Sequence, residues 1–310
     1  MKGKRMIASI SILLLMMVLF GSYVWIDPEK NNLSESERKK LGGTYIKLSN
    51  GVTHYKLSGP LDGQVVVLVH GGTAPLWTWD NQIKVLSEAG FRVLAYDKFG
   101  RGYSDRPNVI YDQELYRNQL FELLNDLKVT GKIDLIGYSL GGGTAVNFAA
   151  QNPEKINKLI LISPVISNYK RPGIFRVPVV GEFITRLIGI KTIVKRFHSL
   201  LEGVSDSDKY VKLYIEQTSY KGFQQSLLSM LRNNLLEDYT NAYQVLGEQE
   251  KEILLIWGEE DTEITREMID DIRSYLPRLE FKAVADVGHG IVFQKPQTVN
   301  TAIIDFLLEK

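Results

Sequence analysis

The 310-residue chain contains no cysteine, and this absence excludes several kinds of chemistry. Disulfide bonds, thiolate catalysis, cysteine-ligated zinc and lipoprotein-type attachment through a cysteine are all ruled out. The absence is compatible with an oxidising compartment but does not establish one.

An excess of charge of either sign is also lacking. The 37 lysine and arginine residues nearly balance 36 acidic residues, which leaves a net charge of +1 at pH 7. This balance points to neither a nucleic acid nor an acidic partner. The glycine-rich stretch at residues 141–143 lacks the Gly-Lys of a phosphate-binding loop, and no His-x-x-x-His spacing or carboxylate cluster suggests a metal. We therefore expect no metal, no nucleotide and no nucleic acid.

What the chain does have is a long uncharged apolar run near its N-terminus. Residues 6–26 contain no charge and follow a basic start with Lys2, Lys4 and Arg5. A run of this length can cross a hydrocarbon core about 30 Å thick as a helix. We therefore expect a membrane anchor over residues 1–26.

The flanks of this run indicate its orientation. Tyr23 and Trp25 lie near its far end, where aromatic side chains favour a membrane interface, and the basic start should stay cytoplasmic. We thus expect a membrane-anchored protein whose folded part is extracytoplasmic. The alternative is a cleaved signal peptide and a secreted protein, although no A-x-A-like cleavage site follows Phe20.

The rest of the chain divides into three parts. Residues 27–43 are polar and charged and predict a linker. In residues 44–165 and 248–310, short β-branched runs alternate with amphipathic helical stretches. This alternation predicts an α/β fold with a mainly parallel sheet covered by helices on both faces. Residues 166–247 show no convincing buried strand and predict a helical cap over one end of the sheet.

The pentapeptide Gly-Tyr-Ser-Leu-Gly centred on Ser139 joins a predicted buried strand directly to a predicted helix. Such a turn holds the serine in a strained backbone conformation and lifts its hydroxyl clear of the backbone. Side chains two residues before and two after would collide there, which explains Gly137 and Gly141. Partial positive charge at the start of the following helix favours a nearby oxyanion. We predict that Ser139 is a nucleophile.

A serine hydroxyl is a poor nucleophile without a base, and the chain has only four histidines. His54 precedes the parallel core, His198 lies in the predicted cap, and His70 precedes a Gly-Gly turn. His289 lies on a glycine-flanked loop after the last predicted strand, at the sheet edge where ligand sites form. We predict that His289 is the base.

The base needs a carboxylate that holds its tautomer and stabilises the imidazolium. The loop after the strand that ends at Gly258 offers Glu259, Glu260, Asp261 and Glu263. We select Asp261 because the loop must first turn at the glycine and because a shorter side chain suits a fixed partner. A neighbouring glutamate is the alternative.

A second glycine-rich turn, His70-Gly71-Gly72, exposes backbone N–H groups that suit an oxyanion hole. We assign the oxyanion hole to the N–H groups of Gly72 and of Leu140, the residue after the nucleophile. The ring of His70 is expected to brace the turn by hydrogen bonding.

These motifs together resemble the α/β-hydrolase family, in its branch with a helical cap. The resemblance rests on residues 70–72, 97–104, 137–142, 257–261 and 288–290. It implies an eight-stranded, mostly parallel sheet, hydrolysis through an acyl-enzyme, and no cofactor. It also implies that Asp97 accepts loop-stabilising hydrogen bonds. Related haloalkane dehalogenases and epoxide hydrolases use aspartate in place of Ser139, so the carboxylesterase or monoacylglycerol-lipase type is favoured.

We expect a serine hydrolase that cleaves small carboxylic esters with a medium or lipid-like acyl group. Trp77 and Trp79, just after the oxyanion turn, are predicted to line an apolar acyl pocket, with packing beneath the cap or in the core as the alternative. A second enzymatic interpretation is a carbon–carbon bond hydrolase of a diketone-type dienoate. A third, from another class, is a non-catalytic binding module on the same fold. The oligomeric state stays open.

The first half of the predicted cap is strongly basic. Residues 170–196 carry seven lysines or arginines and a single acid, Glu182, with apolar residues between them. A basic amphipathic element of this kind can rest on an anionic membrane. The alternative is a solvated cap whose apolar face closes over the site.

Overall fold

The computed structural model describes residues 27–167, 173–236 and 238–309, together with scattered positions between residues 7 and 25. Most of the predicted anchor at residues 1–26 lies outside the described residues. Within the part of the chain that is described, no helix combines the length and apolarity that a membrane crossing requires.

Eight strands form one sheet in the order β1-β2-β4-β3-β5-β6-β7-β8. The first two strands form an antiparallel hairpin, β2 pairs antiparallel with β4, and the remaining pairs are parallel. This arrangement confirms the mostly parallel eight-stranded sheet. The strands are β1 (Thr44–Leu48), β2 (Gly51–Ser58), β3 (Val65–Val69), β4 (Arg92–Tyr96), β5 (Ile133–Tyr138), β6 (Ile156–Ile162), β7 (Glu252–Gly258) and β8 (Glu280–Val284).

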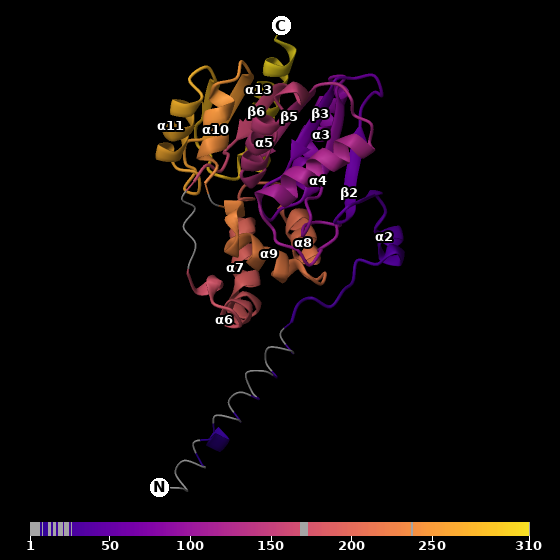
Figure 1. Cartoon of the computed structure of the whole chain (residues 1–310), viewed down its shortest axis with the longest axis vertical. Helices are drawn as coiled ribbons and strands as arrows, with labels where there is room; N and C mark the ends of the chain where they lie inside the picture. The colour runs from indigo at the N-terminus through magenta and orange to yellow at the C-terminus, as the bar shows by residue number, and fades with distance from the viewer. Residues whose placement is uncertain are drawn as a thin grey trace.

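Helices cover both faces of the sheet, as Figure 1 shows. The central strands are largely apolar because alternate side chains enter two separate clusters; in β3, Val67 and Val69 face one, and Val66 and Leu68 face the other. The first cluster is closed by α4 (Gln113–Asp126), α5 (Leu140–Gln151), α10 (Thr240–Gly247) and α11 (Arg266–Tyr275). The second is closed by α3 (Asp80–Glu88), α12 (Ile291–Gln294) and α13 (Pro296–Leu308).

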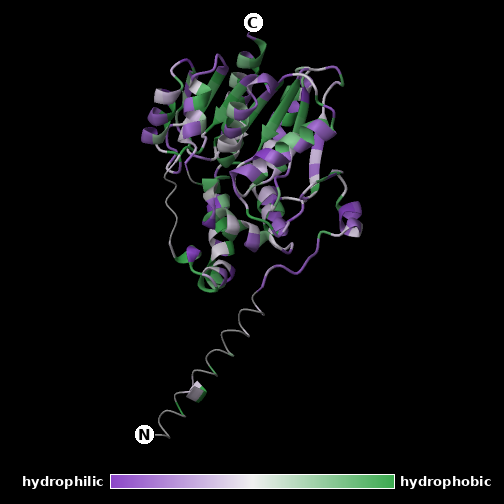
Figure 2. Ribbon diagram, in the orientation of Figure 1, coloured by the Kyte–Doolittle hydropathy of each residue, from purple (hydrophilic) through white to green (hydrophobic). Residues whose placement is uncertain are grey.

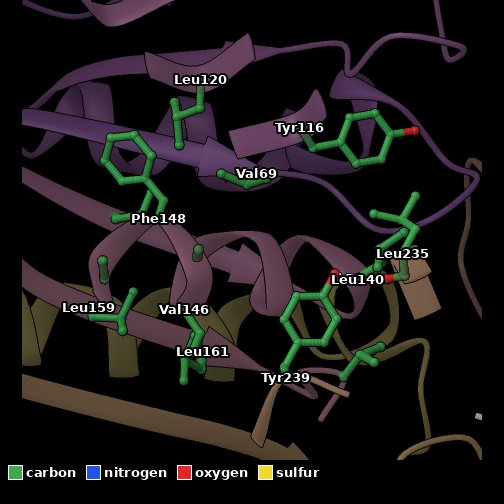
Figure 3. Close-up of a cluster of buried hydrophobic side chains, with 14 of the residues drawn as sticks. Val69, Tyr116, Leu120, Leu140, Val146, Phe148, Leu159, Leu161, Leu235 and Tyr239 are labelled. Carbon is green, nitrogen blue, oxygen red and sulfur yellow. Dashed lines mark hydrogen bonds between the residues drawn. The ribbon is translucent and has the colours of Figure 1, made fainter. Parts of the chain in front are cut away.

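Helix α5 lies at the centre of the first cluster. Figure 3 shows Val146 and Phe148 of this helix among side chains of the strands and of the flanking helices. Phe148 is completely buried, and Tyr239 packs so closely that a methyl group on Gly143 would lie 2.8 Å from its ring. The helix that starts at the predicted nucleophile is therefore held rigidly from all sides.

In the described parts of the segment between β6 and β7, the regular elements are all helices joined by turns, and most of them lie beyond the carboxyl ends of the strands (Figure 1). Its last helix, α10, packs against α5 and α11 and so belongs with the helices that flank the sheet. The name cap is used below for residues 173–236 only. The cap contains η3 (Gly173–Arg176), α6 (Val180–Ile184), the π-helical turn η4 (Thr185–Gly189), α7 (Ile190–Ser199), α8 (Ser207–Thr218), α9 (Phe223–Arg232) and η5 (Asn234–Leu236).

The linker at residues 27–43 contains the short helix α2 (Glu35–Leu41), and its first residues are bound to the cap. Asn31 forms a parallel β-bridge with Tyr220. The Glu29 carboxylate accepts hydrogen bonds from the N–H groups of Gly222 (2.9 Å) and Gln224 (2.5 Å). Because α9 begins after a glycine that has no capping side chain, Glu29 supplies the missing N-terminal acceptor.

Phe148→Ala is expected to destabilise the protein by about 3–5 kcal/mol, because it opens a cavity in a fully packed core. Phe121→Ala on α4 is the matched control; its ring is 38% exposed, and the expected loss is below about 1 kcal/mol. The free energies of unfolding are compared by urea denaturation. Equal midpoints for the two variants would contradict this account of the core.

Candidate active site

Ser139 occupies the turn between β5 and α5 with φ 55° and ψ −122°, a conformation that residues with a side chain rarely adopt. A methyl group on Gly137 would lie 2.4 Å from the carbonyl oxygen of Gly141. One on Gly141 would lie 2.1 Å from the carbonyl oxygen of Val69. Both glycines are therefore required by the turn, which confirms the steric reasoning from the sequence.

The structure brings the three predicted side chains into one hydrogen-bonded chain. The His289 Nε2 atom lies 3.0 Å from the Ser139 hydroxyl, and its Nδ1 atom lies 2.8 Å from an Asp261 carboxylate oxygen. The serine follows β5, the aspartate follows β7, and the histidine follows β8, so the carboxyl ends of three strands bring them together. His289 and Asp261 are both buried, which limits competition from water for these hydrogen bonds.

The Asp261 carboxylate is fixed by its own loop as well as by His289. Its second oxygen accepts the N–H groups of Glu263 and Ile264, each at 2.9 Å. Burial by itself raises the pKa of Asp261, but the His289 hydrogen bond and these backbone donors outweigh it, so the pKa lies below its ordinary value. The carboxylate is thus held ionised, with one oxygen directed at the imidazole.

The two predicted oxyanion donors lie side by side. A methyl group on Gly72 would be 3.6 Å from the Leu140 side chain, so the glycine-rich turn lies directly beside the start of α5. Within the described parts of the chain, neither backbone N–H donates a hydrogen bond. The arrangement leaves both groups available to an anionic oxygen near Ser139.

A buried histidine braces the oxyanion turn. The Lys98 N–H donates to His70 Nε2 (2.9 Å), so the proton is on Nδ1, which donates to the Gly71 carbonyl at 2.8 Å. Burial lowers the pKa of His70 to about 3, and this keeps the ring neutral. The structure thus shows the hydrogen-bonding role that the sequence suggested for His70.

Asp97 and Arg101 connect the same turn to its surroundings. The Asp97 carboxylate accepts the N–H groups of Leu76 (2.7 Å) and Tyr103 (2.8 Å), as expected of a loop-stabilising acceptor. Arg101 donates to the Gly72 carbonyl at 2.7 Å and to the Ser226 hydroxyl of α9 at 2.6 Å. Arg101 therefore links α9 of the cap to the backbone carbonyl of Gly72, whose own N–H group is a predicted oxyanion donor.

A cavity of about 390 Å³ lies between the cap and the sheet, and Ser139, His289 and the turn at Gly71-Gly72 are among the residues that line it. Most of the cavity wall is apolar and comes from the cap. The periodicity of the sequence predicts helices in the cap but does not indicate which of their side chains face the cavity. Apolar lining residues include Phe175, Ile188, Ile193, Leu227, Leu231 and Phe293. The cavity suits an apolar group attached to the reacting atoms.

The cavity wall contains an ion pair, Arg196 with Glu263, that the sequence does not predict. Arg196 of α7 binds both carboxylate oxygens of Glu263, with its Nε 2.7 Å from one of them. The other oxygen of Glu263 lies 3.6 Å from His289 Nε2. Glu263 was considered only as an alternative to Asp261, and the structure instead places it beside the opposite edge of the imidazole. Arg196 belongs to no sequence motif that would identify it as a residue of the site.

Trp77 and Trp79 do not line the cavity, so the predicted acyl-pocket role of these residues is wrong. The 3₁₀ turn η1 (Leu76–Trp79) buries Trp79 completely against Tyr138, with ring centroids 6.3 Å apart. Trp77 packs beneath the cap against Phe197 and Tyr210, at 5.3 and 5.5 Å. Large amphipathic rings near a site are here part of the packing that supports it.

Across the described residues, no three histidine, aspartate or glutamate side chains come together in a way that could hold a metal ion.

Comparison with known proteins agrees with this architecture. Residues 64–180 match the alpha/beta hydrolase fold family. The chain is 28% identical over 285 residues to the AB hydrolase superfamily protein YfhM of Bacillus subtilis, covering 84% of this chain and 96% of that protein. It is 26% identical over 301 residues to epoxide hydrolase 3 of Xenopus tropicalis, covering 89% and 80%.

Solved structures share the fold. A thermophilic esterase from Thermogutta terrifontis superposes with a TM-score of 0.72 at 24% identity, covering 86% of this chain and 98% of the esterase. A meta-cleavage product hydrolase from Pseudomonas fluorescens superposes with a TM-score of 0.69 at 22% identity, covering 86% and 97%. These similarities establish the architecture and do not distinguish between substrates.

Gly141→Ala is expected to destabilise the protein by about 2–5 kcal/mol, because the new methyl group meets a backbone carbonyl that cannot move. Gly72→Ala should cost less than about 1 kcal/mol, since its methyl group meets the Leu140 side chain at ordinary contact distance. Thermal unfolding of the two variants measures the difference. A Gly141→Ala protein as stable as Gly72→Ala would show that the turn is not sterically closed.

Proposed function

Since the chain belongs to the α/β-hydrolase fold family, we propose that it is a serine hydrolase that cleaves carboxylic esters with an apolar acyl group. The observation that carries this proposal is the hydrogen-bonded chain from Ser139 through His289 to Asp261 at the end of an apolar cavity. A nucleophile, an oriented base and a place for the acyl group are thus adjacent.

The proposed reaction has two halves. Ser139 Oγ attacks the ester carbonyl carbon while His289 Nε2 takes the hydroxyl proton, and the N–H groups of Gly72 and Leu140 hydrogen-bond the oxyanion. His289 then gives the proton to the departing alcohol, which leaves an acyl-enzyme. Water attacks this ester with His289 again as base, and the acid departs. Asp261 stays ionised throughout and stabilises the imidazolium formed in each half.

The main competing function is carbon–carbon bond hydrolysis of a diketone-type dienoate. The fold shared with a meta-cleavage product hydrolase supports it. A dienoate carries a carboxylate, and its natural partner in this cavity, Arg196, is already occupied by Glu263. That pairing favours an uncharged ester. A non-catalytic binding module is disfavoured because the hydroxyl and imidazole lie within hydrogen-bond distance. The serine at position 139 disfavours epoxide hydrolysis.

The proposal includes a membrane location. The uncharged run at residues 6–26 and its basic flank favour an anchor with the hydrolase domain outside the cytoplasm. Signal cleavage and secretion form the alternative.

Ser139→Ala is expected to lower the turnover of a short p-nitrophenyl ester by at least about a thousandfold, because no other group replaces the nucleophile. Ser87→Ala on α3 is the control; this serine is half-buried and does not line the cavity, so the variant should keep full activity. Turnover is followed by p-nitrophenolate release, and circular dichroism verifies the fold. Undiminished turnover by folded Ser139→Ala protein would refute the assignment.

A series of p-nitrophenyl esters with lengthening acyl chains is expected to show kcat/KM rising by up to about fourfold per methylene until the cavity is filled. Residues 27–310 should match the whole chain on soluble short esters, because the site lies entirely within them. A ring-fission dienoate turned over faster than every ester would select carbon–carbon hydrolysis instead.

A further inference from the structure

We propose that one end of the cap inserts into the surface of the lipid bilayer, so that the active-site cavity receives its ester directly from the membrane. The name cap tip is used for the exposed apolar side chains at this end. They are Ile174, Val177, Val179, Val180 and Ile188. The substrate part of the inference rests on the proposed ester hydrolysis; the membrane contact does not.

The cap tip is an apolar surface that the folded domain itself does not cover. Val179 is 78% exposed and Ile188 is 58% exposed, and α6 contacts both η3 and η4, the other two elements at this end of the cap. Figure 2 shows hydrophobic residues around α6 at the edge of the molecule, at the end opposite the C-terminus. Elsewhere in the described domain, exposed large apolar side chains come from separate elements, as is normal for a soluble surface.

The linker holds this surface next to the predicted anchor. Asp27 directly follows the uncharged run at residues 6–26, and its carboxylate lies 3.1 Å from Arg186 of η4. Glu29 then binds the start of α9 through two backbone N–H groups. These contacts leave no free tether between the end of the run and the cap. If residues 6–26 span the membrane, η4 lies at its surface.

The charge around the tip favours anionic lipid. Lys191 and Lys195 are exposed on α7, which directly follows η4. The single acid of residues 170–196, Glu182, is paired with Arg232, whose two amino groups lie 2.6 and 3.0 Å from its carboxylate oxygens. Exposed positive charge therefore lies next to an apolar tip, which is the combination found in elements that lie in a membrane interface.

The tip and the cavity share residues. Ile188 is part of the exposed tip and also lines the cavity, and Phe175, Thr185 and Gly189 line the cavity from the same turns. The wall of η3 and η4 at this end of the cap is therefore largely apolar, with Phe175 and Ile188 as its large side chains. An ester with a long acyl chain can pass along this wall without leaving an apolar environment. The geometry thus points to lipid-embedded esters as the substrate class.

The contact can be measured independently of catalysis because the chain has no cysteine, so one introduced cysteine is the only labelling site. Val179→Cys in the full chain is labelled with an environment-sensitive fluorophore and reconstituted in vesicles of phosphatidylcholine and phosphatidylglycerol that carry quenchers on their acyl chains. Leu308→Cys is the control; this side chain is 60% exposed at the far end of α13. Quenching of at least about twofold is expected at position 179 and none at position 308.

Any other outcome overturns the membrane contact. An unquenched label at position 179 on vesicle-bound protein places the tip in water. A shielded but unquenched label that responds to protein concentration identifies a second copy of the chain as the partner. Failure of the full chain to bind vesicles also refutes the contact.

A kinetic measurement tests the role of the contact. The double variant Val177→Asp, Val179→Asp is expected to hydrolyse a long-chain ester embedded in vesicles about tenfold more slowly, because the charges oppose insertion. Neither residue lines the cavity, so its rate on a soluble short ester should be unchanged. Leu308→Asp is the matched control. Equal rates of the double variant and the wild type on the embedded ester would overturn lipid delivery. If the wild type hydrolyses no ester at all, the proposed ester hydrolysis is refuted, but the quenching result stays valid.

Discussion

The backbone conformation of Ser139 is the constraint on which the site depends. A positive φ at a residue with a side chain costs about 1–3 kcal/mol and persists only where the surroundings enforce it. Here β5 and α5 enforce it, because both are buried and because no room exists for a side chain at Gly137 or Gly141. The same turn directs the hydroxyl toward His289 and sets the Leu140 N–H beside Gly72. Loss of the turn would remove the proposed nucleophile and one proposed oxyanion donor together.

The cap takes part in this arrangement instead of simply covering it. Arg101 joins the Gly72 carbonyl to α9, and Gln217 of α8 donates to the Thr73 carbonyl at 2.8 Å. On the opposite side of the site, Arg196 holds Glu263 close to the imidazole. A shift of the cap would thus affect both the turn at Gly71-Gly72 and the surroundings of the His289 ring. The cap and the turn at Gly71-Gly72 are therefore joined by direct hydrogen bonds.

Much of the fold could be predicted from the sequence because its signals are local. Continuous β-branched runs mark strands buried on both faces, and a serine between two glycines at a strand end marks the turn. The approach of His289 and Asp261 to Ser139 followed from chain order and the parallel sheet. The direction of a side chain is not a local property, so the sequence leaves open whether Trp77 and Trp79 line a pocket or pack in the core, and the structure shows packing. The sequence does not indicate whether Glu29 lies in a flexible linker or binds the cap. Only the folded structure shows that its carboxylate caps the start of α9.

The tautomer of His70 has a further consequence for how the site responds to acid. Its ring is neutral with a pKa of about 3, and its two nitrogens are committed to fixed partners, one as donor and one as acceptor. Protonation would replace the acceptor with a second donor facing the Lys98 N–H, but this occurs only in strongly acidic solution. Across the neutral range, therefore, the scaffold beneath the oxyanion hole keeps its shape, and any titration seen in kinetics belongs to other groups.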